Sequence, residues 1–157
     1  MDSYFRERRN VELSTLDFFT TQINANWTGI TVVKSFAQSY KSPRPVVAII
    51  LAEIESKRRE IGTTTLDHTY LLRFDIFAKS DGQRQDLSDF MLSTIQDGWT
   101  YSTYTKNPAN AEALIATTAG RVNLVRVNSD LKLDFDEDGD VYDKYRHYIE
   151  CTVRVSV

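Results

Sequence analysis

The sequence predicts an α+β domain with a mainly antiparallel sheet of about five strands and two helices packed on one of its faces. Residues 70–79 and 145–157 alternate apolar and polar side chains, which is the period of a strand with one buried face. Residues 16–27 and 87–99 repeat apolar side chains at three- and four-residue spacing, which is typical of amphipathic helices. At 157 residues the chain has the length of one domain, so we expect a single domain over residues 1–157.

The first helix is predicted to begin after Asn10, because asparagine is a favourable N-cap residue and Glu12 would complement the helix dipole in the first turn. An apolar stripe follows at helical spacing, which indicates the side that packs on the sheet. This stripe consists of Leu16, Phe19, Ile23 and Trp27. A first strand is then expected over residues 30–36, followed by a turn up to Pro45.

Two long strands are predicted at the centre of the chain. The first, starting at Val46, is apolar on both faces as far as Leu51, and a strand covered on both sides has this composition. We expect a helix over one face and either another helix or a neighbouring subunit over the other. A buried helix segment is the alternative for so short an apolar run, although the β-branched residues and the preceding Pro43 and Pro45 favour a strand.

The connection between the two central strands, Ser56 to Asp67, is too polar for a core segment. We expect a charged hairpin arm at residues 56–67. Two roles are open for it: a solvent-exposed hairpin without function, or an extension that reaches a neighbouring molecule.

A second helix is predicted after Ser80, which stands three residues before Gln83 at the spacing of a capping box. The apolar stripe of this helix is Leu87, Phe90, Met91, Ile95 and Trp99. Residues 100–120 are expected to form a loop or insertion. Trp99–Tyr104 could start it as a short strand or an aromatic loop edge, and Lys106–Gly120, with its Pro108 and Ala-rich turns, has the least regular pattern and suits a loop or a short helix.

The two C-terminal strands, residues 121–133 and 145–157, flank an acidic turn. Within this turn, Asp134–Asp140 reproduces the opening D-x-D-x-D-G of a calcium loop. The twelfth position of that pattern is Tyr145 rather than a bidentate glutamate, and the flanking segments are predicted strands rather than helices. A solvated hairpin tip and a cation site are therefore the two alternatives for this turn.

No other motif predicts chemistry. His68, His147 and Cys151 lack the close spacing of a metal-ligand set. The chain has no nucleophile elbow, no G-x-G-x-x-G and no phosphate-binding loop, so we expect no catalytic residue, no cofactor or metal, and no enzymatic activity. A net charge of −3 argues against broad phosphate binding. No segment approaches the roughly 18 apolar residues of a membrane span.

Three segments carry a resemblance to a known family. They are Arg8–Glu12 before the expected start of the first helix, Leu72–Phe77 (LRFDIF) before the second helix, and Asp86–Ile95 (DLSDFMLSTI) within it. Together with the order of the predicted elements, they resemble the tail terminator proteins of long-tailed bacteriophages, which complete the tail and belong to the neck of the virion. The resemblance extends over most of the chain, but residues 106–120 depart from the family pattern.

The resemblance implies a structural virion protein, made in the cytoplasm of the host bacterium, that forms a ring on the tail tube. Such a ring, usually a hexamer, stops tube elongation and makes the head–tail connection. The implied partners are further copies of the chain, the tail tube protein below and a head-side neck or connector protein above. DNA would pass through the channel without specific binding, and no membrane is involved. The alternatives are another neck component, such as a head-completion or joining protein, and a calcium-responsive binding module built on Asp134–Asp140.

Overall fold

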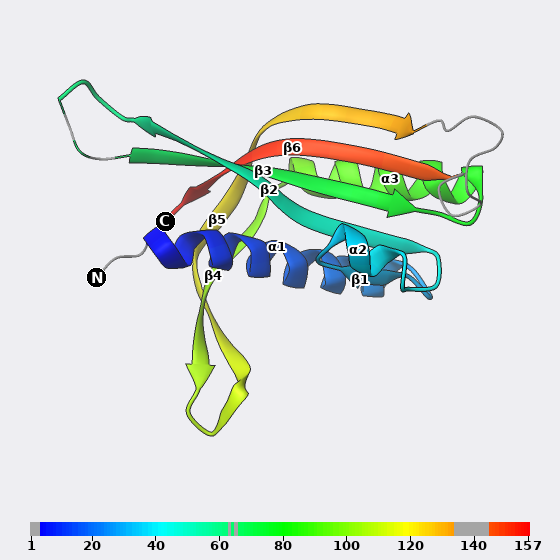
Figure 1. Cartoon of the computed structure of the whole chain (residues 1–157), viewed down its shortest axis with the longest axis horizontal. Coiled ribbons are helices and arrows are strands. Elements are labelled where there is room, and N and C mark those ends of the chain that lie inside the picture. The colour runs from blue at the N-terminus through cyan, green and yellow to red at the C-terminus, as the bar shows by residue number, and fades with distance from the viewer. Residues whose placement is uncertain (1–3, 63, 65, 134–144) are drawn as a thin grey trace.

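A computed structural model describes residues 4–62, 64, 66–133 and 145–157. Its six strands form one curled, half-barrel sheet in the order β1-β2-β3-β6-β5-β4 (Figure 1). The helices are α1 (Tyr4–Asn26), α2 (Phe36–Ser39) and α3 (Asp81–Gln96). The strands are β1 (Thr31–Val33), β2 (Val46–Arg58), β3 (Leu66–Phe77), β4 (Trp99–Asn107), β5 (Asn110–Leu133) and β6 (Arg146–Ser156).

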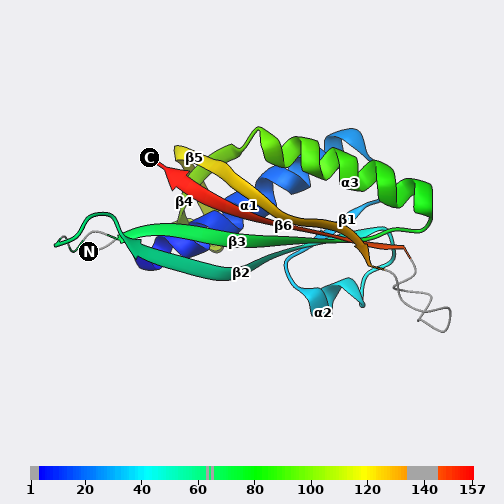
Figure 2. The same cartoon turned by 90° about the horizontal axis from the view of Figure 1, so that it is seen from above.

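The main core lies between the sheet and the two long helices. α1 and α3 lie on the same side of the sheet, and α2 lies on the other side (Figure 2). Phe19 of α1, Phe74 of β3 and Trp99 at the start of β4 form the aromatic centre, with ring centroids 4.9 Å apart for Phe19 and Phe74 and 5.2 Å apart for Phe19 and Trp99. Burial of these large rings is the main favourable term for joining helices and sheet.

The prediction of an antiparallel sheet of five strands with two helices is wrong, because the sheet has six strands of mixed direction and there are three helices. β1 runs parallel to β2, with Thr31 opposite Val46, and residues 34–45 with α2 form the crossover that a parallel pair requires. α2 is one helical turn, which is too short to show a periodic pattern in the sequence.

The missed strand is β4, which pairs with the first half of β5 across residues 100–120. The structure therefore has a hairpin where the sequence predicts a loop or insertion, although the short strand that was one alternative for Trp99–Tyr104 forms part of β4. Most side chains of its outer part are exposed, including Leu114 and Ile115. Since neither face of this part is buried, the apolar–polar alternation that reveals a half-buried strand is absent, and backbone pairing defines the strands instead.

β2 and β3 form the long antiparallel pair that the sequence predicts, from Val46 opposite Phe77 to Arg58 opposite Leu66, with one irregularity between Leu51 and Glu53. The start of β2 is buried on both faces, and α2 packs against it on the side away from α1 and α3. Of the two covers proposed for this side, the one present within the chain is a helix.

The outer edge of β4 is covered by polar side chains of α1. The Ser14 hydroxyl donates to the carbonyl of Ser102 (3.2 Å) and accepts from the backbone N–H of the same residue (2.9 Å). The Asn10 carboxamide oxygen accepts from the backbone N–H of Tyr104 (3.2 Å). These bonds satisfy backbone groups that an edge strand would otherwise leave open.

The predicted N-cap role of Asn10 is wrong, because α1 already begins at Tyr4 and Asn10 lies inside the helix. By contrast, the predicted start of α3 is confirmed, since the Ser80 hydroxyl accepts from the backbone N–H of Gln83 (3.2 Å). Leu87, Met91 and Ile95 of the predicted stripe are fully buried.

Candidate interaction surface on the open face of the sheet

The face of β2, β3, β6 and β5 turned away from α1 and α3 is covered by a described helix only at one end, where α2 lies (Figure 2). We call this surface the open face. Its side chains include Ile50, Glu53, Glu55, Thr69, Leu71, Arg73, Arg126, Leu131, Tyr148, Glu150 and Thr152. Two grooves of about 570 Å³ and 530 Å³ lie along it. An open sheet face that crosses four strands is a candidate for contact with another macromolecule.

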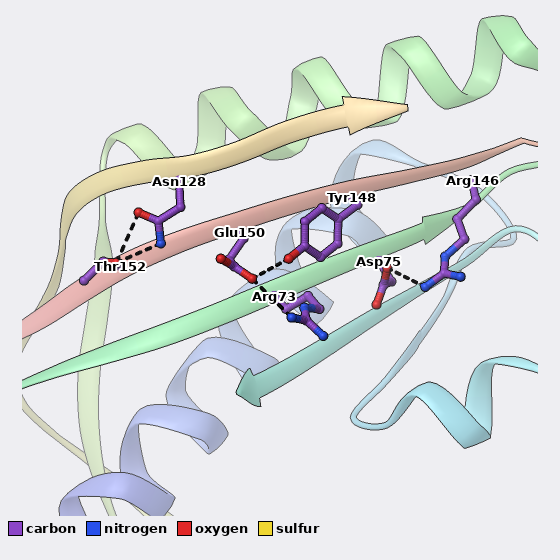
Figure 3. A network of polar contacts seen from close by, with 7 residues as sticks. All are labelled: Arg73, Asp75, Asn128, Arg146, Tyr148, Glu150 and Thr152. Carbon is purple, nitrogen blue, oxygen red and sulfur yellow. Dashed lines mark hydrogen bonds and ion pairs between the residues drawn. The ribbon is translucent and has the colours of Figure 1, made fainter. Parts of the chain in front are cut away.

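A row of polar contacts crosses the middle of the open face (Figure 3). Arg73 of β3 donates to the Glu150 carboxylate of β6 at 3.2 Å, and the Tyr148 hydroxyl donates to the same carboxylate. The Arg73 guanidinium also lies over the Tyr148 ring, 5.1 Å from its centroid. Further along the open face, the Asn128 carboxamide of β5 donates to the Thr152 hydroxyl of β6 at 3.0 Å. These contacts hold the polar side chains in fixed positions on an exposed surface.

The hydrogen bond from Tyr148 lowers the pKa of Glu150 below its usual 4.5, and Arg73 acts in the same direction. The carboxylate therefore contributes stability that is present above pH 4.5 and is lost as the pH falls through its lower folded-state pKa. We expect Glu150→Gln to reduce the free energy of unfolding by about 1 kcal/mol near pH 7 and by much less near pH 3. Urea unfolding at the two pH values measures this difference, with Tyr148→Phe as the variant that removes the main cause. An equal loss at both pH values would contradict this role of Glu150.

A buried ion pair lies at the end of the open face next to α2. Asp75 of β3 is 1% exposed, and the Arg146 guanidinium of β6 donates to it at 3.0 Å (Figure 3). Burial raises the pKa of Asp75, and the charge and hydrogen bond of Arg146 oppose this rise. The same guanidinium lies 4.6 Å from the ring centroid of Phe36 and 5.0 Å from that of Phe77. Arg146 therefore links α2 to the sheet through both charge and stacking.

The groove beside this ion pair is largely apolar. Its lining includes Phe36, Ile50, Leu131 and Leu133, and its volume is about 530 Å³. Phe36 is 36% exposed and Leu131 is 42% exposed. Large apolar side chains that remain exposed around a groove mark a surface suited to another apolar surface.

Two hairpin arms extend beyond the body of the sheet (Figure 1). The first is the end of the β2–β3 hairpin, at the predicted arm of residues 56–67, where strand pairing continues out to Arg58 and Leu66. Asp67 at its base forms ion pairs with Arg154 (2.9 Å) and Arg59 (3.8 Å). The second arm is the outer part of the β4–β5 hairpin, which the sequence did not predict. Its exposed Leu114 and Ile115 stand opposite Lys106 and Thr105 of β4, so strand pairing extends into both arms.

The residues that the sequence offered as possible ligands lie apart. His147 is buried, where the guanidinium of Arg84 donates to its Nδ1 (2.8 Å) and its Nε2–H donates to Asp130 (2.5 Å). His68 Nδ1 contacts the Ser56 hydroxyl at 2.7 Å on the first arm. Cys151 is fully buried, and burial raises the pKa of its thiol to about 12.

The acidic turn Asp134–Asp140 lies outside the described residues. Within the residues that are described, no three His, Cys, Asp or Glu side chains come close enough together to hold a metal ion. None of the helices in the same part of the chain combines the length and apolar composition needed to cross a bilayer.

The sequence matches no model of a known protein family and no curated protein. The features that bear on function are therefore the open face, the two arms and the resemblance to tail terminators.

Proposed function

We propose that this chain is a structural subunit of a ring that caps the tail tube of a long-tailed bacteriophage, stops its elongation and joins it to the neck. This is the role that the resemblance to tail terminators implies. The observation that supports it most is the open face, beside which two strand-paired hairpin arms extend. A protein with these features acts through its interfaces and carries out no reaction.

A ring accounts for the exposed apolar side chains at several separate places. Phe36 and Leu131 on the open face, and Leu114 and Ile115 on the second arm, all contact solvent in an isolated subunit. In a ring, each subunit meets two neighbours through two different surfaces, so separate apolar patches are buried at once. Contacts to the tube protein below and to a head-side neck protein above would use the surfaces that remain.

The charges of the open face suit passage of DNA without binding. Two of its arginines are paired with carboxylates, Arg73 with Glu150 and Arg146 with Asp75, and the chain carries a net charge of −3. DNA-binding surfaces instead present unpaired basic residues that neutralise phosphates. A channel lined by such a face would therefore not retain the duplex.

The direct test is inactivation of the gene for this chain in a phage that encodes it, followed by electron microscopy of the particles. We expect tail tubes of irregular, increased length that are not attached to heads. Tails of normal length beside tailless heads would instead favour another neck component, such as a joining protein. Normal virions would contradict both roles.

A second test uses the purified chain, whose mass is 18.1 kDa. Light scattering over a concentration series is expected to give one discrete multiple of this mass, and the value is expected to be the same with added calcium and with chelator. A monomer whose melting temperature rises with calcium would contradict the ring and favour a binding module at Asp134–Asp140.

A further inference from the structure

We propose that neighbouring copies join edge to edge, with residues 50–58 of β2 in one copy pairing with residues 123–131 of β5 in the next. This inference rests on the proposed ring and names the interface that builds it. It would make the sheet continuous from one subunit to the next.

The first free edge belongs to β2. On one side, β2 pairs with β3 along its whole length, from Val46 to Arg58. On the other side, the parallel partner β1 is only three residues long and ends opposite Ala48. In the part of the chain that the structure describes, β2 has no strand partner on this side from Ile50 to Arg58.

The second free edge belongs to β5, which is long enough to have different neighbours along its two halves. β4 pairs with β5 from Asn110 to Val122, and β6 pairs with it from Arg121 to Leu133. The side of β5 away from β6 therefore has no described strand partner over residues 123–131, and this half of β5 forms the upper border of the sheet in Figure 1.

These two edges differ from the third long edge of the sheet. The outer edge of β4 receives hydrogen bonds from Ser14 and Asn10 of α1, as described above. Long strand edges with open N–H and C=O groups readily pair with other strands, and proteins usually cover or shorten the edges that must stay single. The edge of β4 is covered by side chains of α1, whereas among the described residues similar lengths of β2 and β5 have no strand partner on their outer side.

Strand direction allows the two open edges to pair. β3 is antiparallel to β2, β6 is antiparallel to β3, and β5 is antiparallel to β6. β5 therefore runs opposite to β2. If the next copy extends the sheet with its open face on the same side, its β5 lies antiparallel beside β2, and the two edges can form an antiparallel ladder. This ladder would include the irregularities that β2 has between Leu51 and Glu53 and that β5 has between Leu124 and Arg126 and between Val127 and Ser129.

The side chains of the two edges also match in one register. When Glu55 stands opposite Arg126 of the next copy, Ile54 stands opposite Val127 and Ile50 opposite Leu131. The first and third pairs lie on the open face, where all four residues line grooves. In the second pair, Ile54 packs against the core, whereas Val127 is 37% exposed and lines the same groove as Arg126. Arg126 is exposed and has no ion pair among the described residues, so a carboxylate across the interface would supply one.

Because the two edges are different, the contact is head-to-tail and propagates from copy to copy until a ring closes. Pairing of β2 with the β2 of another copy is the main competing arrangement. It would be symmetric and would stop at a dimer, so the two arrangements differ in mass and in the residues that meet.

Charge reversal tests the proposed interface. We expect Glu55→Arg and Arg126→Glu each to shift the mass measured by light scattering from the ring to the monomer. The two variants mixed in equal amounts should form the ring again, because each then meets a partner edge of opposite charge. Circular dichroism and the melting temperature of each variant show whether the subunit itself stays folded. If the variants keep the wild-type ring mass, or if the mixture stays dissociated although both variants are folded, the edge pairing is wrong.

Cysteine cross-linking tests the same contact without relying on charge. Ile50→Cys with Leu131→Cys in one chain should give a ladder of disulfide-linked multimers on a non-reducing gel, and the native Cys151 is buried and does not compete. A control with Glu55→Cys alone should stay unlinked, whereas a symmetric β2–β2 pair with its axis at Glu55 would link it as a dimer. A ring that forms without the ladder would overturn the edge pairing and leave the proposed function intact. A ladder from an assembly that never closes into a ring would support the pairing and contradict the proposed function.

Discussion

Replacing Arg146 by alanine is expected to lower the free energy of unfolding by about 3–5 kcal/mol, because it leaves a buried carboxylate without its partner. Asp75 is 1% exposed and receives the guanidinium at 3.0 Å. The variant also loses the stacking of Arg146 on Phe36 and Phe77, which helps to hold α2 on the sheet. Urea unfolding followed by circular dichroism measures the change.

The pH dependence and two control variants separate the causes of this loss. Burial raises the pKa of Asp75 above 3.8. A carboxyl group with a raised folded-state pKa adds to the free energy of unfolding at low pH, and this stabilising contribution is lost as the pH rises through the folded-state pKa. Without Arg146, the deficit should therefore grow as the pH rises from acid to neutral. Arg146→Lys should restore part of the stability, and the double variant Asp75→Leu/Arg146→Met should recover most of it, because no charge is then buried. A loss for Arg146→Ala below about 1 kcal/mol would show that the pair is not isolated from water.

Replacing Trp99 by alanine is expected to cost about 3–5 kcal/mol, because it opens a large cavity at the centre of the core. Trp99 is 1% exposed, its ring stacks on Phe18 with centroids 6.1 Å apart, and it meets Phe19 edge-on. Its indole N–H donates to the Thr15 hydroxyl at 3.1 Å. The loss should be visible as a lower urea midpoint and a lower melting temperature.

Two smaller changes divide this effect into packing and hydrogen bonding. Trp99→Phe should retain much of the aromatic contact and lose clearly less stability than the alanine variant. Thr15→Val leaves the indole N–H buried without an acceptor, with an expected loss of about 1–3 kcal/mol. If Trp99→Ala costs no more than Thr15→Val, the core collapses around the cavity and the packing argument fails.

Local sequence patterns predict the elements that have one buried and one exposed face. β3 and β6 follow from alternation, as in Leu72, Phe74 and Ile76, because every second side chain of a half-buried strand faces the core. α3 follows from the Ser80 cap and from its apolar stripe, because capping and helical spacing are local properties of the chain. The first arm follows from the polarity of residues 56–67.

Other features depend on partners that are distant in the sequence, and these become visible in the folded chain alone. β4 and the first half of β5 are strands because their backbones pair with each other. Most side chains in the outer part of this hairpin are exposed, so its sequence lacks the alternation of apolar and polar residues that marks a half-buried strand. The sequence predicts Asn10 as a helix cap, but its side chain accepts a hydrogen bond from the backbone N–H of Tyr104, 94 positions away. Contacts between distant parts of the chain also set the parallel direction of β1, the cover that α2 provides and the open edges of β2 and β5. Strand order and strand neighbours are set by packing of the whole chain, and no local pattern encodes them.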